Sequence, residues 1–304
     1  MRIKVIFNPH AGRGKAVKLK PEILAGLAES NYHWEETRRH GHAVEIAQKA
    51  VADRFDLIIA AGGDGTINQV VNGMVGSGIP LGVLGCGTGN DFASMLGMPK
   101  EPGRAVRRII AGETRRVDLC RINNRYFISS VGIGFDGEVA YNVNRGIRFA
   151  GGMAAYLLGV FKTFFSFKLR RIKLVIDGKT REFNALMLAV TNSRSYGGGI
   201  KITPEARIDD GLFDICVVKD LPPVKILYCL PMAVKGIHHR LRNVEMFRGR
   251  EVYLESSSPV FYHMDGEVFK DTVFHFSLLP GSFPVKGADF EPWLTAETAA
   301  AKEA

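Results

Sequence analysis

Apolar and polar positions follow two alternating patterns over the first third of the chain, one typical of strands and one typical of helices. Short apolar runs, typical of buried strands, lie at residues 3–7, 32–36, 56–61 and 80–84. Apolar residues recur at helical spacing over residues 17–29, 43–53, 66–75 and 102–111. Strands that alternate with helices form βαβ units, so the pattern predicts an α/β domain with an open parallel sheet.

The pattern of apolar and polar positions changes near residue 115. From there, strand-like runs follow one another closely and are joined by turns, apart from helical stretches at residues 151–167 and 223–237. We therefore expect a second domain that is a mainly antiparallel β-sandwich. The predicted boundaries are residues 1–120 for the first domain, 121–290 for the second and 291–304 for a solvated C-terminal tail.

The composition is that of an ordinary globular protein with a basic surface. The 304 residues suffice for two domains, 46% of them are hydrophobic, and the net charge is +9. A positive charge suits anionic partners such as nucleotide phosphates or an acidic membrane face, and the sequence has no recognisable nucleic-acid module. The four cysteines have no zinc-site spacing and indicate a reducing cytoplasm.

One stretch, residues 149–167, is almost entirely apolar and imitates a membrane span. Its glycines, Lys162 and its marginal length disfavour spanning. The basic residues Lys168, Arg170 and Arg171 follow it, as in an amphipathic helix that lies on an anionic membrane surface. The alternative is an ordinary helix packed on the β domain with a solvated basic end.

Glycine, hydroxyl and amide residues gather where the four predicted strands of the first domain end. The loops are NPHAGRGK at residues 8–15, TRRHGHA at 37–43, GGDGTIN at 62–68 and GCGTGNDF at 85–92. In an open α/β sheet, ligands bind at the carboxyl ends of the strands, near the point where the strand order reverses. The sequence therefore predicts a ligand site built from these loops.

The loop that contains Asp64 has the composition of a polyphosphate cradle. Its glycines let backbone N–H groups approach an anion, and Thr66 is placed to cap the helix that follows. A carboxylate beside phosphates repels them unless a cation lies between, so Asp64 indicates Mg²⁺. The alternative is a glycine turn in which Asp64 is only a local hydrogen-bond acceptor. The Walker and G-x-G-x-x-G motifs are both absent.

Several short motifs occur in an order that points to one family. They are Asn8-Pro-x-x-Gly12, Gly62-Gly-Asp-Gly-Thr66 with Asn68, Gly87-Thr-Gly-Asn-Asp-Phe92, Val117-Asp-Leu119, Gly134-Phe-Asp136, Asp210-Gly-Leu-Phe-Asp214 and Asp265-Gly-Glu267. Over roughly residues 1–285, this ordered set resembles the bacterial diacylglycerol kinase-like lipid kinases, relatives of the sphingosine kinases and NAD kinases. The resemblance implies an NAD kinase-like nucleotide-binding first domain and a lipid-substrate second domain.

The resemblance also implies roles for individual positions. It implies ATP contacts from Asn8, Pro9, His10, Ala11, Gly12, Thr37, Gly62, Gly63, Asp64, Gly65, Thr66, Ile67, Asn68 and Thr88. It makes Glu267 the general base and Asp64 a catalytic residue, with Asp91 and Asp118 joining Asp64 in organising a catalytic Mg²⁺. It further implies a structural Mg²⁺ in the second domain, bound by Asp210 and the backbone of Arg207 and Leu212.

The residues themselves support these roles unevenly. Glu267 follows a glycine turn in a β run, where it could take a proton from a substrate hydroxyl or be only an exposed turn residue. The stretch around Asp210 is also typical of an Asp-Asp-Gly turn before a strand.

Asp91 could cap a helix, and Asp118 could pair with a nearby arginine. For Asp136 and Glu138, the resemblance implies that one faces the lipid head group, and the sequence does not choose between them.

Together these observations predict an ATP- and Mg²⁺-dependent kinase that phosphorylates a lipid hydroxyl, first of all that of diacylglycerol. Phosphatidylglycerol, a sphingoid base or ceramide are alternative acceptors, and an NAD kinase-like enzyme or a non-catalytic lipid-binding regulator are alternative functions. The expected partners are ATP, the lipid and a membrane surface, without nucleic acid, and a homodimer is compatible with the sequence. The expected location is cytoplasmic and peripheral, at the inner face of the membrane.

Overall fold

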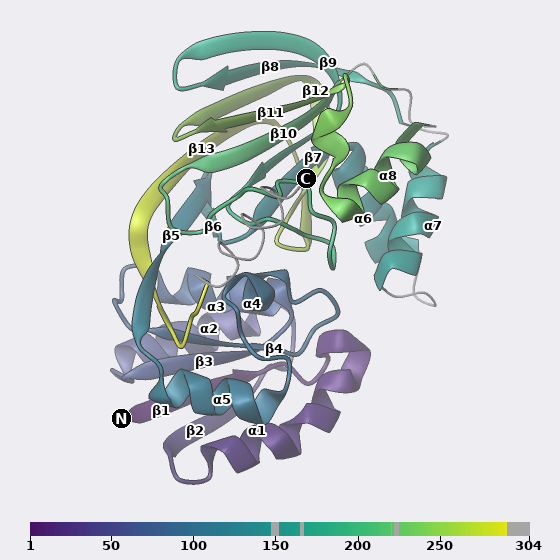
Figure 1. The fold of residues 1–304 in the computed structure, drawn as a ribbon. Coiled ribbons are helices and arrows are strands. Elements are labelled where there is room, and N and C mark those ends of the chain that lie inside the picture. The colour runs from purple at the N-terminus through teal and green to yellow at the C-terminus, as the bar shows by residue number, and fades with distance from the viewer. Residues whose placement is uncertain (147–151, 165–166, 220, 222–224, 291–304) are drawn as a thin grey trace, which may run out of the picture. The chain divides into compact units, whose positions relative to one another are not determined.

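The computed structural model describes residues 1–146, 152–164, 167–219, 221 and 225–290. The chain divides into two compact units, one of Met1–Val117 with Phe283–Ala304 and one of Asp118–Ser282. It enters the second unit within β5 (Thr114–Ile122) and returns within β13 (Glu267–Lys286). Figure 1 shows the first unit mainly in purple and blue and the second in teal and green.

The first unit is built on a parallel sheet whose strand order reverses beside β1. β1 (Arg2–Phe7) lies between β2 (Asn31–Glu36) and β3 (Leu57–Gly62), and β4 (Leu81–Gly85) follows β3. The last part of β13 adds to β4 in parallel. β3 is buried along its whole length, as a central strand covered on both faces must be. The predicted strands of the parallel sheet are confirmed to within one residue at each end.

Helices cover this sheet as two packed pairs. α1 (Lys20–Leu27) packs on α5 (Pro102–Ala111), and α2 (His42–Ala52) packs on α3 (Asp64–Met74). Figure 1 shows the two pairs on opposite faces of the sheet. The helices cover the two faces of the sheet, and the loops that lead from strands to helices lie at its carboxyl edge.

The second unit is a mainly antiparallel β-sandwich, as predicted. Its strands are β5, β6 (Arg125–Phe127), β7 (Ser130–Gly134), β8 (Arg170–Ile176), β9 (Lys179–Thr191), β10 (Phe213–Lys219), β11 (Val244–Gly249), β12 (Val252–Met264) and β13. β7 and β8 each pair with both β9 and β12, along different stretches of these two long strands. Large apolar side chains fill the core, among them Phe127 and Phe213, whose rings stack with centroids 6.1 Å apart.

Helices of the second unit pack on the strands through a separate apolar cluster. α7 (Gly152–Phe164) and α8 (Ile226–Lys235) fall within predicted helical stretches, whereas the pattern does not predict α6 (Phe135–Gly146). α6 and α7 approach closely at Gly159, which has no Cβ. A Cβ there would lie only 2.6 Å from Val143 Cγ2. Within the described residues, no helix has the length and apolar character needed to cross a membrane.

Candidate active site

The loops after β1, β3 and β4 meet at the point where the strand order of the first unit reverses. Asn8 Nδ2 donates to Thr66 Oγ1 at 2.8 Å, which joins the loop after β1 to the start of α3. Cys86 N donates to Gly62 O at 2.8 Å, which holds the loop after β4 beside β3. The order β2-β1-β3-β4 has its switch point between β1 and β3, where α/β folds bind ligands.

Glycines let the backbones of these loops touch. A Cβ on Gly87 would lie 2.5 Å from Gly63 Cα, and a Cβ on Gly12 would lie 2.9 Å from Cys86 O. Side chains at these positions would therefore force the loops apart. Close backbone contacts between glycine loops are typical of phosphate sites, in which N–H groups bind the anion.

The loop after β1 is not the start of a regular helix. It enters a 3-10 segment, η1 (Ala11–Leu19), in which Gly12, Arg13 and Gly14 have φ values of 58°, 62° and 82°. These left-handed residues precede the helix predicted over residues 17–29, whose first part instead continues the 3-10 segment, so regular α-helix begins only at Lys20. A non-glycine residue in this conformation is uncommon, and such strain gathers at ligand-binding loops.

Thr66 does not cap the helix, contrary to the prediction. α3 begins at Asp64 with Gly63 as its N-cap, so Thr66 already lies within the first turn. The extended conformation of Gly63, with φ −87° and ψ 177°, lets the helix start earlier than its apolar pattern suggests. The Thr66 hydroxyl instead accepts the hydrogen bond from Asn8.

Asp64 joins the start of α3 to the start of α4 (Asp91–Met95). Its Oδ1 accepts the N–H of Phe92 at 3.1 Å, and Asn90, rather than Asp91, is the N-cap of α4. Burial raises the pKa of Asp64, the nearby Asp91 carboxylate raises it further, and backbone N–H groups lower it. Two carboxylates in such a setting favour a bound cation, so they fit the predicted Mg²⁺.

These two carboxylates do not form a complete metal site by themselves. No group of three or more His, Cys, Asp or Glu side chains that could hold a metal ion is found among the described residues. Mg²⁺ commonly keeps several waters and binds through one or two carboxylates together with substrate phosphates. Asp64 and Asp91 could supply the carboxylates for such a mode, and a Mg²⁺ here stays a prediction.

The other predicted ATP contacts differ in their exposure. Thr88 and His10 are exposed, whereas Thr37, Ile67 and Asn68 are buried. The structure therefore places Thr88 and His10 within reach of a ligand from solvent. Ile67 and Asn68 lie on the packed side of α3, where they support the loop.

Glu267 follows a two-residue turn between β12 and β13. Asp265 and Gly266 have φ values of 45° and 90°, as in a type I′ turn, and Met264 pairs with Glu267 across it. The buried Asp265 carboxylate accepts the N–H groups of residues 128, 129 and 130 at 2.9, 3.1 and 2.9 Å. Asp265 therefore ties the turn to the start of β7 and positions the partly exposed Glu267.

A buried ion pair lies on the strand that leads into this turn. His263 Nε2 lies 2.6 Å from Asp136 Oδ2, and the two side chains are 8% and 1% exposed. A Cβ on Gly132 would lie 2.2 Å from the Asp136 carboxylate, so the pair requires glycine there. Asp136 is thus held internally, and Glu138 is the more exposed of the two predicted head-group residues.

The His263–Asp136 pair makes stability depend on pH. Burial lowers the pKa of His263, but the Asp136 and Asp265 carboxylates together raise it by more, so the net shift is upward. The pair therefore stabilises the fold fully below the ordinary histidine pKa of 6.5, and this stabilisation is lost as the pH rises through the higher folded pKa.

We expect the free energy of unfolding to fall over this window by up to about 1.4 kcal/mol per pH unit. The fall should be smaller in Asp136→Asn, which lacks the charge that raises the His263 pKa, and unchanged in His239→Gln, a control at an exposed histidine. Urea unfolding at a series of pH values measures it. Equal slopes in the wild type and Asp136→Asn would contradict this account.

Asp118 connects two backbone segments of the second unit. Its Oδ2 accepts Gly211 N and its Oδ1 accepts Gly281 N, both at 2.7 Å. Burial raises the pKa of Asp118, and the two hydrogen bonds lower it. These contacts position the loop that contains Asp210, while a place for Asp118 in the metal network stays a prediction.

Asp210 and Asp214 share one guanidinium group. Arg248 Nη2 contacts Asp210 Oδ2, and Arg248 Nε donates to Asp214 Oδ1 at 3.1 Å. Asp210 Oδ1 accepts the N–H of Leu212 at 3.2 Å. Asp210, the predicted ligand of the structural Mg²⁺, is therefore already in contact with a positively charged side chain, that of Arg248.

Sequence reasoning missed three contributors: the Asp265 carboxylate, the His263–Asp136 pair and Arg248. Asp265 and Asp136 stand inside quoted motifs, so their presence was a signal although their partners were not. No local signal marks Arg248, which lies in the ordinary strand β11 and is placed opposite Asp214 by strand register.

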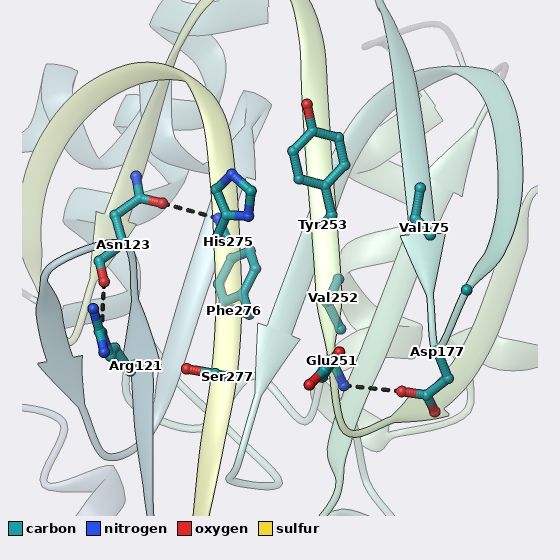
Figure 2. A pocket seen from close by; sticks show the side chains of 11 residues that line it. Arg121, Asn123, Val175, Asp177, Glu251, Val252, Tyr253, His275, Phe276 and Ser277 are labelled. Carbon is teal, nitrogen blue, oxygen red and sulfur yellow. Dashed lines mark hydrogen bonds between the residues drawn. The ribbon is translucent and has the colours of Figure 1, made fainter.

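A separate hollow of about 530 Å³ lies on the second unit, with residues of β5, β8, β12 and β13 in its wall. Figure 2 shows Tyr253 and His275 on neighbouring strands of this wall, with ring centroids 4.8 Å apart. Asn123 Oδ1 accepts His275 N, and Asp177 accepts the N–H of Glu251. None of the predicted catalytic or metal-binding residues lines the hollow, so we assign it no part in the reaction.

Two family models match the chain in succession. Residues 2–122 match the diacylglycerol kinase catalytic domain, and residues 129–286 match the YegS C-terminal NAD kinase beta sandwich-like domain. The α/β unit and the β-sandwich unit thus correspond to the two parts of a known architecture, and the class of protein is a lipid kinase.

Relatives that match this chain along most of their length agree with the family models. The chain is 32% identical over 290 residues to the diacylglycerol kinase of Bacillus subtilis (strain 168), which covers 93% of this chain and 92% of the relative. It is 30% identical over 270 residues to that of Staphylococcus epidermidis (strain ATCC 12228), covering 88% and 85%. A solved structure from Bacillus anthracis str. Sterne, assigned to the diacylglycerol kinases, superposes with a TM-score of 0.80 at 26% identity over 94% of both chains. The chain belongs to the bacterial diacylglycerol kinase-like lipid kinase family.

Proposed function

We propose that this protein transfers the γ-phosphoryl group of ATP to the hydroxyl group of diacylglycerol, producing phosphatidic acid and ADP. The observation that carries the proposal is the close contact of glycine loops at the switch point of the first unit, where Gly63 and Gly87 meet. The names of the relatives support diacylglycerol as the acceptor.

In this proposal the first unit binds the nucleotide. Backbone N–H groups of the loops after β1, β3 and β4 bind its phosphates, and the N-terminus of α3 adds a favourable dipole. Asp64 and Asp91 would hold Mg²⁺, which would supply positive charge against the phosphate oxygens. Burial and the nearby Asp91 carboxylate raise the pKa of Asp64, and a bound cation would stabilise its charged form.

Glu267 accepts the hydroxyl proton. The lipid oxygen forms a bond to the γ-phosphorus, the bond from that phosphorus to the bridging oxygen of ADP breaks, and the proton moves to the Glu267 carboxylate. The partial exposure of Glu267 suits contact with a substrate, and the Asp265 anchor holds it in place. A base held by a buried anchor needs little reorganisation during the reaction.

We propose that α7 and α8 bring the protein to the membrane surface that contains its lipid. Phe161 on α7 is 61% exposed and Tyr228 on α8 is 69% exposed, while Val160 and Thr163 face inward. Lys162 is exposed beside Phe161, so the outer side of α7 is both apolar and basic, as in helices that lie on anionic membranes. The free cysteines, three of them buried, suit the cytoplasm, where ATP is available.

Transfer from labelled ATP in the presence of Mg²⁺ tests the proposal. The acceptors are diacylglycerol, phosphatidylglycerol, a sphingoid base and ceramide in mixed micelles, and NAD in solution. We expect transfer to diacylglycerol at least about tenfold faster than to any other acceptor. Faster transfer to another lipid would make that lipid, rather than diacylglycerol, the substrate. Transfer to NAD alone would contradict the lipid assignment, and no transfer would favour a non-catalytic regulator.

A further inference from the structure

The loop before β10 carries an unusual concentration of negative charge. Asp209, Asp210 and Asp214 lie within it or just beyond it, and the buried Asp118 carboxylate holds its backbone at Gly211. Asp214 is 6% exposed and Asp210 is 17% exposed as side chains, so water screens these charges poorly. A cation beside these carboxylates therefore stabilises the folded loop.

Arg248 supplies that cation from the neighbouring strand. β10 and β11 pair with Asp214 directly opposite Arg248, so strand register places the guanidinium beside the loop. Its Nη2 reaches Asp210 and its Nε reaches Asp214, so one planar group contacts both carboxylates and offsets one of their two negative charges. The fork geometry of arginine suits such double contacts, which the single ammonium of lysine makes less well.

The guanidinium keeps its positive charge at any ordinary pH, so Arg248 is a permanent cation beside both carboxylates.

The same contacts leave poor ligands for a divalent ion. Asp210 Oδ2 faces the guanidinium, and Asp210 Oδ1 accepts the N–H of Leu212 at 3.2 Å. Mg²⁺ requires near-octahedral oxygen ligands at short distances, and here it would meet a positive charge on the same carboxylate. We propose that Arg248 is the resident cation of this loop and takes the place of the structural Mg²⁺ that the family resemblance implies at Asp210.

Thermal unfolding of the full chain without nucleotide tests this inference independently of any kinase activity. The wild type should unfold at the same temperature in EDTA and in Mg²⁺. Arg248→Met, which keeps the aliphatic stem but removes the charge, should unfold at a lower temperature in EDTA. Mg²⁺ at a hundredfold excess over its dissociation constant should then raise that midpoint by about 5 °C.

Two further variants identify the site. Arg250→Met removes the same charge from an exposed residue two positions away and should show neither the loss nor the Mg²⁺ response. Adding Asp210→Asn to Arg248→Met should abolish the Mg²⁺ response, because the vacated carboxylate is what binds the ion.

The result that would overturn the inference comes from the wild type and does not require Arg248→Met to fold. It is a rise of the wild-type midpoint by several degrees with Mg²⁺ that disappears in Asp210→Asn. A folded Arg248→Met that fails to respond to Mg²⁺ would equally contradict Arg248 as the substitute for the ion.

Discussion

Replacing Glu267 with glutamine is expected to lower kcat for transfer to the lipid by about 10²-fold to 10⁴-fold and to leave the KM values close to those of the wild type. Glutamine has nearly the shape of glutamate but cannot accept the hydroxyl proton. The turn that carries residue 267 is held by the Asp265 carboxylate and by strand pairing with Met264, neither of which uses the Glu267 carboxylate. Steady-state transfer of labelled phosphate gives both parameters.

Glu182→Gln is the matched control for this variant. Glu182 belongs to the same unit, is exposed and pairs with Arg171 at the surface, so the same chemical change there should leave kcat unaltered. Unchanged circular dichroism would show that Glu267→Gln is folded. Wild-type turnover in a folded Glu267→Gln would remove Glu267 as the general base.

Replacing Gly87 with alanine is expected to weaken ATP binding by about 10²-fold. The new Cβ would lie 2.5 Å from Gly63 Cα and 3.0 Å from Asn90 Oδ1, and the first of these neighbours is backbone that cannot rotate away. The loops after β3 and β4 must separate, which displaces the N–H groups that we propose bind phosphate. Calorimetric titration with ATP and Mg²⁺ measures the dissociation constant.

Gly103→Ala makes the same chemical change at a site with room for it. A Cβ on Gly103 would lie no closer than 3.6 Å to its neighbours, which is ordinary contact, and alanine is favoured over glycine within α5. This control should bind ATP as the wild type does. An unaltered dissociation constant in Gly87→Ala would show that the nucleotide does not depend on this loop contact.

Much of the fold follows from short-range pattern. α5 spans Pro102–Ala111, the range that its apolar spacing predicts. β12 differs, because the serines at residues 256–258 suggest a break, yet Val252–Met264 is one strand that pairs with β8 and then with β7. Its continuity is decided by partners on neighbouring strands rather than by its own composition.

α6 and β11 have weak local signals in the sequence, for related physical reasons. α6 begins directly after Gly134, whose φ of 87° turns the chain, and its many polar residues weaken the helical pattern. β11 alternates apolar and charged residues over a short stretch and is held by its register with β10. In both cases tertiary contacts outweigh a weak local preference.

The candidate active site likewise has residues that the sequence predicts and contacts that it does not. Asp64 and Glu267 stand in motifs whose residue types already indicate phosphate, metal and proton-transfer chemistry. The contacts that hold these residues could not be predicted, since Asp64 accepts an N–H from Phe92 on another helix and Asp265 is anchored by residues 128–130.

By itself, the sequence determined the two fold classes, the glycine-rich loops at the strand ends and the lipid kinase expectation, because these depend on residue types at short spacings. Only the tertiary structure decided the partner of each buried charge. Arg248 meets Asp210 across 38 residues, His263 meets Asp136 across 127, and Gly281 meets Asp118 across 163. Contacts over such separations depend on strand register and on the packing of distant segments, which local sequence patterns do not encode.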